Sequence, residues 1–221
     1  MSKINQRRLT QIRNLYKSGS SMKEIARDLG FTINEVCYFF RKNKIQCRSR
    51  IESNGIKFQR KKPSFAIKQK LSVDELILKT IGVMLYWGEG SKWSGEKIVD
   101  LANSDAEMIR LFLSFLRKIC GIKESKLRAF VYCYKNQSAG EIIKFWSSVT
   151  KIPKKQFTKP YIKKYFDPAK TQKMVHGLIH IRYGDKKLLL QIKEWIEEYK
   201  EYGQIPKRST GRDCKSRASA S

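Results

Sequence analysis

The spacing of apolar residues changes along this chain, and the change limits the folds open to it. Up to about residue 45, apolar residues recur only at helical spacing, every three or four positions. A basic segment without clear periodicity follows, and beyond it helical stretches are interrupted by stretches that alternate like strands. The sequence therefore predicts a small helical domain (1–47), a basic linker (48–70), a larger α+β domain (71–203) and a basic, Ser-rich, disordered tail (204–221).

The first segment has the pattern of a helix-turn-helix. Ser21 and Glu24 stand at capping-box spacing, Gly30 supplies a tight turn, and Thr32 can cap the third helix. Residues 22–31, Met-Lys-Glu-Ile-Ala-Arg-Asp-Leu-Gly-Phe, resemble the first half of many bacterial helix-turn-helix modules. In such modules the last helix enters the major groove, and an ordinary three-helix packing unit is the alternative. The outward polar residues of that helix are the candidate DNA contacts: Asn34, Glu35, Tyr38, Arg41 and Lys42.

The charge of the chain favours a polyanionic partner. Lys and Arg number 47 against 20 Asp and Glu, a formal net charge of +27 spread over 221 residues. A ribosomal or membrane-surface protein would share this excess, but there is no basic amphipathic anchor, signal peptide or apolar run of about 20 residues. Five scattered cysteines without a Cys-x-x-Cys pair indicate reduced thiols rather than disulfides or zinc. We therefore expect a cytoplasmic nucleic-acid-binding protein that does not contact membranes.

The larger domain alternates helical and strand-like segments. Ser72 and Glu75 form a capping-box pair at the start of a helix from Leu71 to Trp87, and Ser104 is placed to cap the next one. The basic linker before this domain is either a solvated tether or an extended segment that follows a phosphate backbone. The expected elements are helices at 71–87, 104–121, 142–149 and 186–199, and strands near 93 and at 98–102, 126–134, 157–162 and 176–183.

One motif within this domain carries chemistry. Residues 83–91, Val-Met-Leu-Tyr-Trp-Gly-Glu-Gly-Ser, bring one carboxylate between two glycines at a helix end. They resemble the LAGLIDADG motif of homing endonucleases in the variant form that ends Asp-Gly-Glu-Gly-Ser. Met84 stands where that family usually has glycine or alanine, and Trp87 where it usually has aspartate. The positions that match are Leu85, Tyr86, Gly88, Glu89 and Gly90.

The resemblance implies a fold and a mode of assembly. The order of elements over 71–199 approximates the αββαββα fold of that family with one helix more, in which a four-stranded antiparallel sheet forms a saddle in the DNA major groove. Two motif helices pack at a twofold axis there, and each ends in an acidic metal ligand. With a single motif, this chain is expected to form a homodimer through Leu71 to Trp87, with Glu89 as catalytic metal ligand.

The chemistry agrees with this expectation. Hydrolysis of a phosphodiester needs an activated water and charge stabilisation, which Mg²⁺ or another divalent cation provides while keeping most of its own waters. One carboxylate per subunit can then suffice, and Lys92 is a basic helper close by. His176 and His180 share a strand face but lack a third zinc ligand. The residues expected to face duplex DNA from the sheet are Lys126, Arg128, Tyr132, Tyr134, His180 and Arg182.

Three hypotheses follow. The first is a homodimeric, sequence-specific double-stranded DNA endonuclease of the homing type, with an added helix-turn-helix. The second is a noncatalytic DNA-binding transcription regulator on the same scaffold, and the third is an RNA-binding maturase. The presence of Glu89 between both flanking glycines favours the enzyme.

Overall fold

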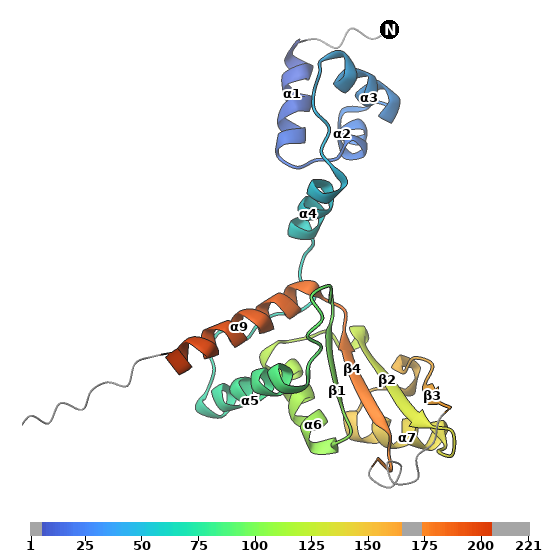
Figure 1. The fold of residues 1–221 in the computed structure, drawn as a ribbon. Helices are drawn as coiled ribbons and strands as arrows, with labels where there is room; N and C mark the ends of the chain where they lie inside the picture. Colours follow the sequence, from blue (N-terminus) through green and yellow to red (C-terminus); the bar gives the residue numbers. More distant parts are fainter. Residues whose placement is uncertain (1–5, 165–173, 205–221) are drawn as a thin grey trace, which may run out of the picture. The chain divides into compact units, whose positions relative to one another are not determined.

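The protein consists of two compact units. The computed structural model describes residues 6–164 and 174–204, and the chain divides into one unit that ends at Lys62 and another that begins at Pro63 (Figure 1). Among the described helices, none is both long and apolar enough to cross a membrane.

The first unit is entirely helical. Capping boxes at Ser21/Glu24 and Thr32/Glu35 start its second and third helices, and Gly30 adopts a left-handed conformation (φ 73°) in the turn between them. A core of Ile12, Ile25, Ala26, Val36, Phe39 and Phe40 joins the first three helices. The helices are α1 (Gln6–Lys17), α2 (Met22–Leu29), α3 (Ile33–Lys42) and α4 (Arg50–Arg60).

Helix α4 lies in the segment for which the sequence predicted an aperiodic linker. A third capping box, at Ser49 and Glu52, begins it. Arg48 places its guanidinium 3.8 Å from the Tyr16 ring centroid and donates hydrogen bonds to the Tyr16 and Ser20 carbonyls. Arg60 donates to the Gly19 carbonyl at 3.1 Å. These contacts attach α4 to the first unit, so basic residues of the expected linker hold the unit together.

The second unit has the expected α+β class, with helices packed on a mixed four-stranded sheet. Strand β4 lies between β1 and β2 and is antiparallel to both. Short helical turns join the main elements at Phe115–Ile119, Glu124–Lys126 and Lys154–Gln156. The main elements are α5 (Val73–Glu89), β1 (Val99–Asn103), α6 (Ala106–Ser114), β2 (Leu127–Tyr134), α7 (Ala139–Thr150), β3 (Tyr161–Lys163), β4 (Leu178–Tyr183) and α9 (Lys186–Gln204).

The sheet corrects two expectations. Strand β3 pairs in parallel with β2, so the sheet is not wholly antiparallel; helix α7 lies between the two strands in sequence and supplies the crossover that parallel strands need. The strand expected near Trp93 is absent, because residues 91–98 form a loop, and only Gly90 pairs with Leu101. The predicted cap Ser104 is also wrong, since Asp105 accepts from the Glu107 and Met108 amides instead.

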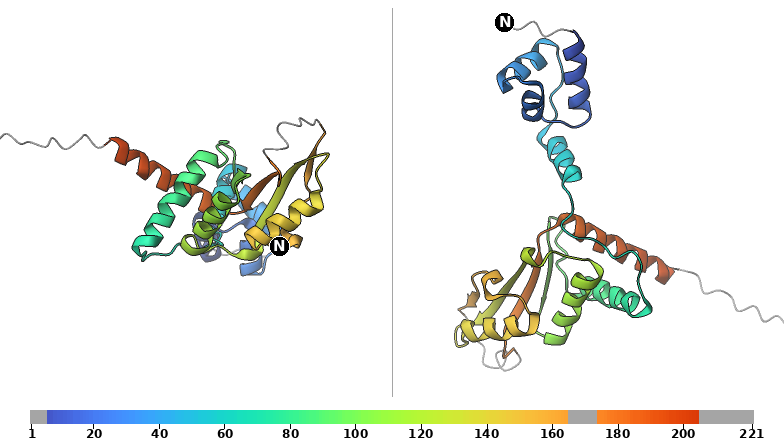
Figure 2. Two further views of the ribbon diagram at one scale, coloured as in Figure 1. Left: turned by 90° about the horizontal axis from the view of Figure 1, so that it is seen from below. Right: turned by 180° about the vertical axis from the view of Figure 1, so that it is seen from behind.

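One face of the sheet forms the core. In Figure 1 the strands lie in front of α7, whereas in the view from behind in Figure 2 helices α6 and α7 lie in front of the strands. Buried strand residues such as Leu101, Val131 and Ile181 pack there with Phe112 and Trp146. The strand residues that point away from these helices do not take part in this core.

The end of the expected linker belongs to the second unit. Ser64 is buried, and its hydroxyl donates to the Asp185 carboxylate at 2.7 Å, while the Tyr183 hydroxyl donates to the Ser64 carbonyl. The Ala66 and Lys68 amides bond to the carbonyls of Cys120 and Ile119. A buried polar cluster therefore anchors the chain at the point where the second unit begins.

Candidate nucleic-acid interface

Glu89 is the last residue of α5 and is exposed. Its carboxylate has no hydrogen-bond or ion-pair partner within the described parts of the chain. The C-terminal end of a helix carries partial negative charge, so an acidic group at that end does not stabilise the helix. Within the described residues, no contact of the fold accounts for an acidic residue at this position.

Gly90 fixes where Glu89 lies. A Cβ atom on Gly90 would stand 2.4 Å from the Tyr86 carbonyl oxygen and 2.6 Å from the Tyr86 ring, so only glycine fits. The Gly90 amide donates to that carbonyl at 2.8 Å, and Gly90 also bridges to Leu101. The helix end is thereby joined to β1, which fixes the backbone next to Glu89.

The neighbours of Glu89 differ in their exposure. Lys92 is exposed and its ammonium lies 3.4 Å from the Gly88 carbonyl, so a positive charge sits at the same helix end. Trp87 is partly buried against the core of the second unit, and the Lys200 ammonium lies 5.7 Å from the centroid of the Trp87 ring. The bulk of Trp87 is thus accommodated within the subunit. Met84 is 47% exposed on the outer side of α5.

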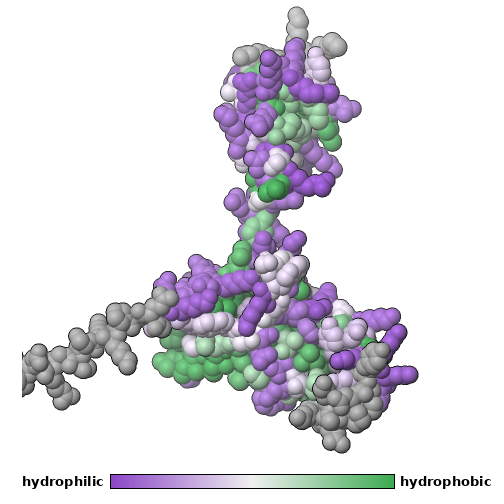
Figure 3. All heavy atoms as spheres, in the orientation of Figure 1, coloured by the Kyte–Doolittle hydropathy of each residue, from purple (hydrophilic) through white to green (hydrophobic). Residues whose placement is uncertain are grey.

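Helix α5 exposes an apolar stripe. Gly82, Val83 and Tyr86 are buried, and a Cβ atom on Gly82 would stand 2.1 Å from the Phe115 ring, so this side of the helix lies close against the core. The opposite side forms hydrophobic surface at the lower left of Figure 3. Its exposed members recur at helical spacing and form the α5 stripe: Val73, Leu76, Ile77, Thr80, Met84 and Gly88.

The face of the sheet opposite the core carries charged and aromatic side chains, which we call the open face. Here His180 and Phe130 lie in one row across β4 and β2, with Arg182 and Arg128 in the next. Rings pack on one another around Tyr132, whose centroid is 4.9 Å from those of Phe130 and Tyr161 and 5.1 Å from that of His180. The charged and aromatic residues of the open face are Asp100, Arg128, Phe130, Tyr132, Tyr134, Tyr161, Lys163, His180 and Arg182.

Asp100 organises the middle of the open face. Its carboxylate is nearly buried and accepts from Arg182 Nε at 2.8 Å, and it lies 2.9 Å from His180 Nδ1. Burial is the largest influence on the Asp100 pKa and raises it, but the hydrogen bonds and charges of His180 and Arg182 together hold the pKa below its usual value. The sequence analysis did not single out Asp100, although an aspartate between Val99 and Leu101 in an apolar strand is an available signal.

One of the predicted sheet contacts lies outside the sheet, and another lies on the open face but is bonded to backbone carbonyls. Lys126 is outside the strand, because β2 begins at Leu127 and Lys126 ends the preceding helical turn. Arg128 is exposed, but one of its terminal nitrogens donates to the carbonyls of Ser125 and Leu127. Tyr132, Tyr134, His180 and Arg182 lie on the open face as the alternation predicted.

In the first unit, helix α3 exposes the predicted residues. Asn34, Tyr38 and Arg41 recur at helical spacing, and Tyr38 is 54% exposed. Lys42 is exposed at the end of the helix. Glu35 is exposed as well, but its carboxylate accepts from the Thr32 amide and hydroxyl in a capping box, and these bonds lower its pKa. Its spacing from Thr32 was the signal for this structural role.

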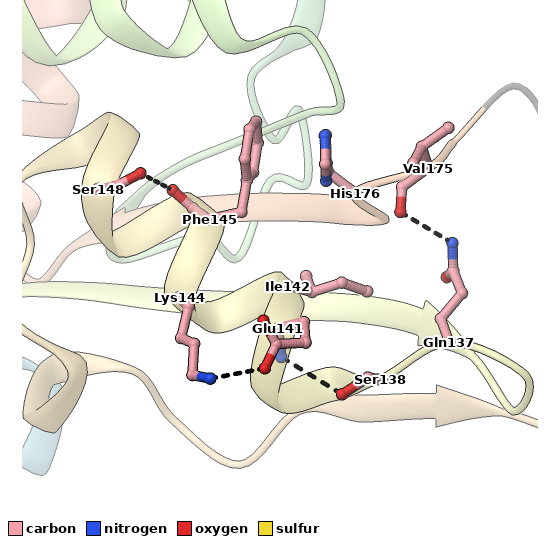
Figure 4. Close-up of a pocket in the computed structure, with 9 residues that line it drawn as sticks. All are labelled: Gln137, Ser138, Glu141, Ile142, Lys144, Phe145, Ser148, Val175 and His176. Atoms are coloured by element: carbon pink, nitrogen blue, oxygen red, sulfur yellow. Dashed lines mark hydrogen bonds and ion pairs between the residues drawn. The ribbon is translucent and has the colours of Figure 1, made fainter.

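The second histidine does not join His180. His176 precedes β4 and stacks on Phe145 of α7, with ring centroids 3.5 Å apart, at an open pocket of about 520 Å³ (Figure 4). The His176 carbonyl accepts from the Trp146 indole at 2.7 Å. Within the described residues no group of three or more His, Cys, Asp or Glu side chains is placed to hold a metal ion.

Comparisons with models of protein families, with curated proteins and with solved structures found no match to this chain. The resemblance of residues 83–91 to the LAGLIDADG motif therefore stays a prediction.

Proposed function

We propose that the protein is a homodimeric endonuclease that cuts double-stranded DNA by metal-dependent phosphodiester hydrolysis, in the manner of LAGLIDADG homing endonucleases. The observation that carries the proposal is the unpartnered Glu89 carboxylate at the end of α5, on a helix whose outer side is apolar and exposed. A buried structural role would give this carboxylate a partner. If the site is shared between two subunits, the carboxylate is expected to have no partner within a single subunit.

The α5 stripe is the proposed dimer contact. Leu76 and Ile77 are each 53% exposed, and Val73 is 76% exposed, which is costly for a helix that faces only water. In a twofold dimer the same stripe meets its own copy, and each helix end brings one Glu89 towards the axis. Gly88 lies in the stripe with no atom within 4 Å of a Cβ built on it, so a second helix has room to approach there.

The residues at this helix end suit a hard divalent cation. A carboxylate from each subunit, with water completing the shell, is a ligand set that Mg²⁺ accepts. A bound cation would polarise the scissile phosphate and lower the pKa of an attacking water. The Lys92 ammonium lies 3.4 Å from the Gly88 carbonyl and would neutralise charge on a phosphate bound nearby.

The DNA contacts would come from both units. Helix α3 offers Asn34, Tyr38 and Arg41 on one exposed side, suited to a major groove, with Lys42 nearer the phosphates. The open face of the sheet offers hydrogen-bond donors between packed rings. A net charge of +27 adds sequence-independent attraction to the duplex.

The noncatalytic regulator is the second candidate, and Met84 favours it. This side chain is exposed in the α5 stripe, where a close crossing of two helices calls for a small residue. A wider crossing would separate the two Glu89 carboxylates and leave DNA binding without cleavage.

A selection from random duplexes distinguishes the two candidates. The full-length protein is incubated with the library with and without Mg²⁺, and bound fragments and newly formed ends are sequenced. The proposal predicts a twofold-symmetric bound site and Mg²⁺-dependent ends at its centre. A symmetric site without ends would support the regulator, and enrichment of structured RNA over duplex DNA in a parallel selection would overturn both in favour of a maturase.

A further inference from the structure

Arg182 is held by two neighbours on the open face. Its Nε donates to Asp100 at 2.8 Å, and its guanidinium carbon lies 4.8 Å from the Phe130 ring centroid. Asp100 itself is fixed, because its other oxygen contacts His180 at 2.9 Å and its side chain is only 11% exposed. The plane and direction of the guanidinium are therefore set before any ligand binds.

This arrangement leaves the outer edge of the guanidinium available. Within the described residues, the two terminal nitrogens of Arg182 have no hydrogen-bond partner, and the side chain is 33% exposed. Two parallel N–H donors in a fixed plane match the O6 and N7 acceptors that guanine presents in the major groove. Adenine replaces the O6 acceptor with an amino donor, so it would leave one guanidinium donor unpaired.

We propose that Arg182 determines sequence specificity by bonding a guanine base in the major groove, with Asp100 as its positioning residue. The inference rests on the proposed function, since it takes duplex DNA on the open face as given. In a twofold dimer it assigns one guanine to each half of the target.

The place of Arg182 in the sheet favours a base over a phosphate. Strand β4 is internal, with β1 on one side and β2 and β3 on the other. Strands lie about 4.8 Å apart, so four of them span roughly the 12 Å width of a major groove. Side chains on an internal strand then face the base edges, whereas those at the sheet edge, such as Lys163 on β3, face the phosphates.

The test compares base preferences of full-length variants without divalent cations, so that DNA is bound and not cut. Bound duplexes are selected with the wild type, and affinities are then measured for the selected site and for every single-base change in it. A bidentate contact predicts that replacing the assigned guanine weakens wild-type binding roughly 10- to 100-fold. Arg182→Ala should bind the guanine and substituted sites about equally. Arg182→Lys keeps the charge without the fork and should also lose the preference.

Arg128→Ala is the matched control, since Arg128 lies beside Arg182 on the same face but donates to backbone carbonyls. Strand β2 is internal as well, but the backbone carbonyls occupy a terminal nitrogen that Arg128 would need for a bidentate base contact. Arg128→Ala should therefore weaken all sites alike and keep the guanine preference. Asp100→Asn removes the charge that holds Arg182 and should reduce the preference while overall affinity falls less. Thermal unfolding of each variant establishes that it is folded.

Each outcome bears on one claim. Equal weakening of all sites by Arg182→Ala and Arg182→Lys, with the guanine preference intact, would make Arg182 a phosphate contact and overturn the inference alone. A selected wild-type site with no required guanine would overturn it as well. Failure of the wild type to enrich any duplex would overturn the proposed function, and the inference with it.

Discussion

Two glycines of α5 face opposite surroundings. A Cβ atom on Gly82 would stand 2.1 Å from Phe115, whereas one on Gly88 would meet nothing within 4 Å. The structure places both inside α5, where a glycine costs about 1 kcal/mol relative to alanine, whereas the sequence prediction ended this helix at Trp87. Only Gly82 has a reason among the described residues of this chain, and the proposed dimer would supply the reason for Gly88.

Substitution by alanine should separate these roles. Gly82→Ala forces α5 away from Phe115 and should lower the free energy of unfolding by about 1–3 kcal/mol. Gly88→Ala should leave stability unchanged or raise it by up to about 1 kcal/mol, while it weakens dimerisation and cleavage. Urea unfolding at fixed protein concentration and sedimentation measure the two effects. Equal stability of Gly82→Ala and the wild type would contradict the close packing of this helix.

The contribution of Asp100 to stability should depend on pH in the acid range. Its pKa in the folded protein is lowered, despite the raising effect of burial, by the hydrogen bonds and charges of His180 and Arg182. A lowered pKa means that the ionised carboxylate adds stability above the unfolded-state value of about 3.9 and loses it as pH falls through the folded-state pKa. The difference in unfolding free energy between the wild type and Asp100→Asn should therefore shrink below about pH 4. A difference that stays constant down to about pH 2 would contradict this role.

For single residues, the sequence predicted the face of the sheet on which a side chain lies better than it predicted the residue to which that side chain bonds. Alternation along β2 and β4 was enough to place Tyr132, Tyr134, His180 and Arg182 on one face. It could not show that Arg182 is bound to Asp100, because that contact joins residues 82 positions apart. Glu35 was assigned to DNA, although its capping box with Thr32 is local and could have been predicted.

Among the elements, helix α5 carries the strongest prediction. Leu76 and Ile77 are exposed, so replacing either by aspartate should leave the subunit folded but put charge into the proposed dimer contact. Each variant should sediment as a monomer at concentrations where the wild type is a dimer. Leu190→Asp is the matched control, since Leu190 is 45% exposed on α9 and lies outside the stripe. A dimer that persists in Leu76→Asp and Ile77→Asp would locate the contact elsewhere.

The elements that the sequence missed share a physical cause. Helix α4 has no fully buried residue, and its clearest local signal is the Ser49–Glu52 capping box. The pairing of β3 with β2 depends on the crossover through α7, and three exposed strand residues do not reveal a partner or a direction. Elements with a long buried side, such as α5 and α9, were predicted to within a few residues.

For the whole molecule, the amino-acid composition gave the net charge, and the spacing of apolar residues predicted the order of the two domains. A helical unit followed by an α+β unit was expected in this chain of net charge +27. In the structure the first unit ends at Lys62 and the second begins at Pro63. The division of the basic segment between the two units was not predicted, because it depends on contacts of Arg48, Arg60 and Ser64 with residues distant in sequence.

Cleavage by Glu89→Gln tests the central claim most directly. The variant is compared with the wild type and with Glu198→Gln, an exposed glutamate on α9, on the selected duplex with Mg²⁺. If Glu89 holds the metal, Glu89→Gln should not cut, yet its Kd without divalent cations should change by less than about threefold. Glu198→Gln should cut like the wild type. Undiminished cutting by Glu89→Gln would contradict the account.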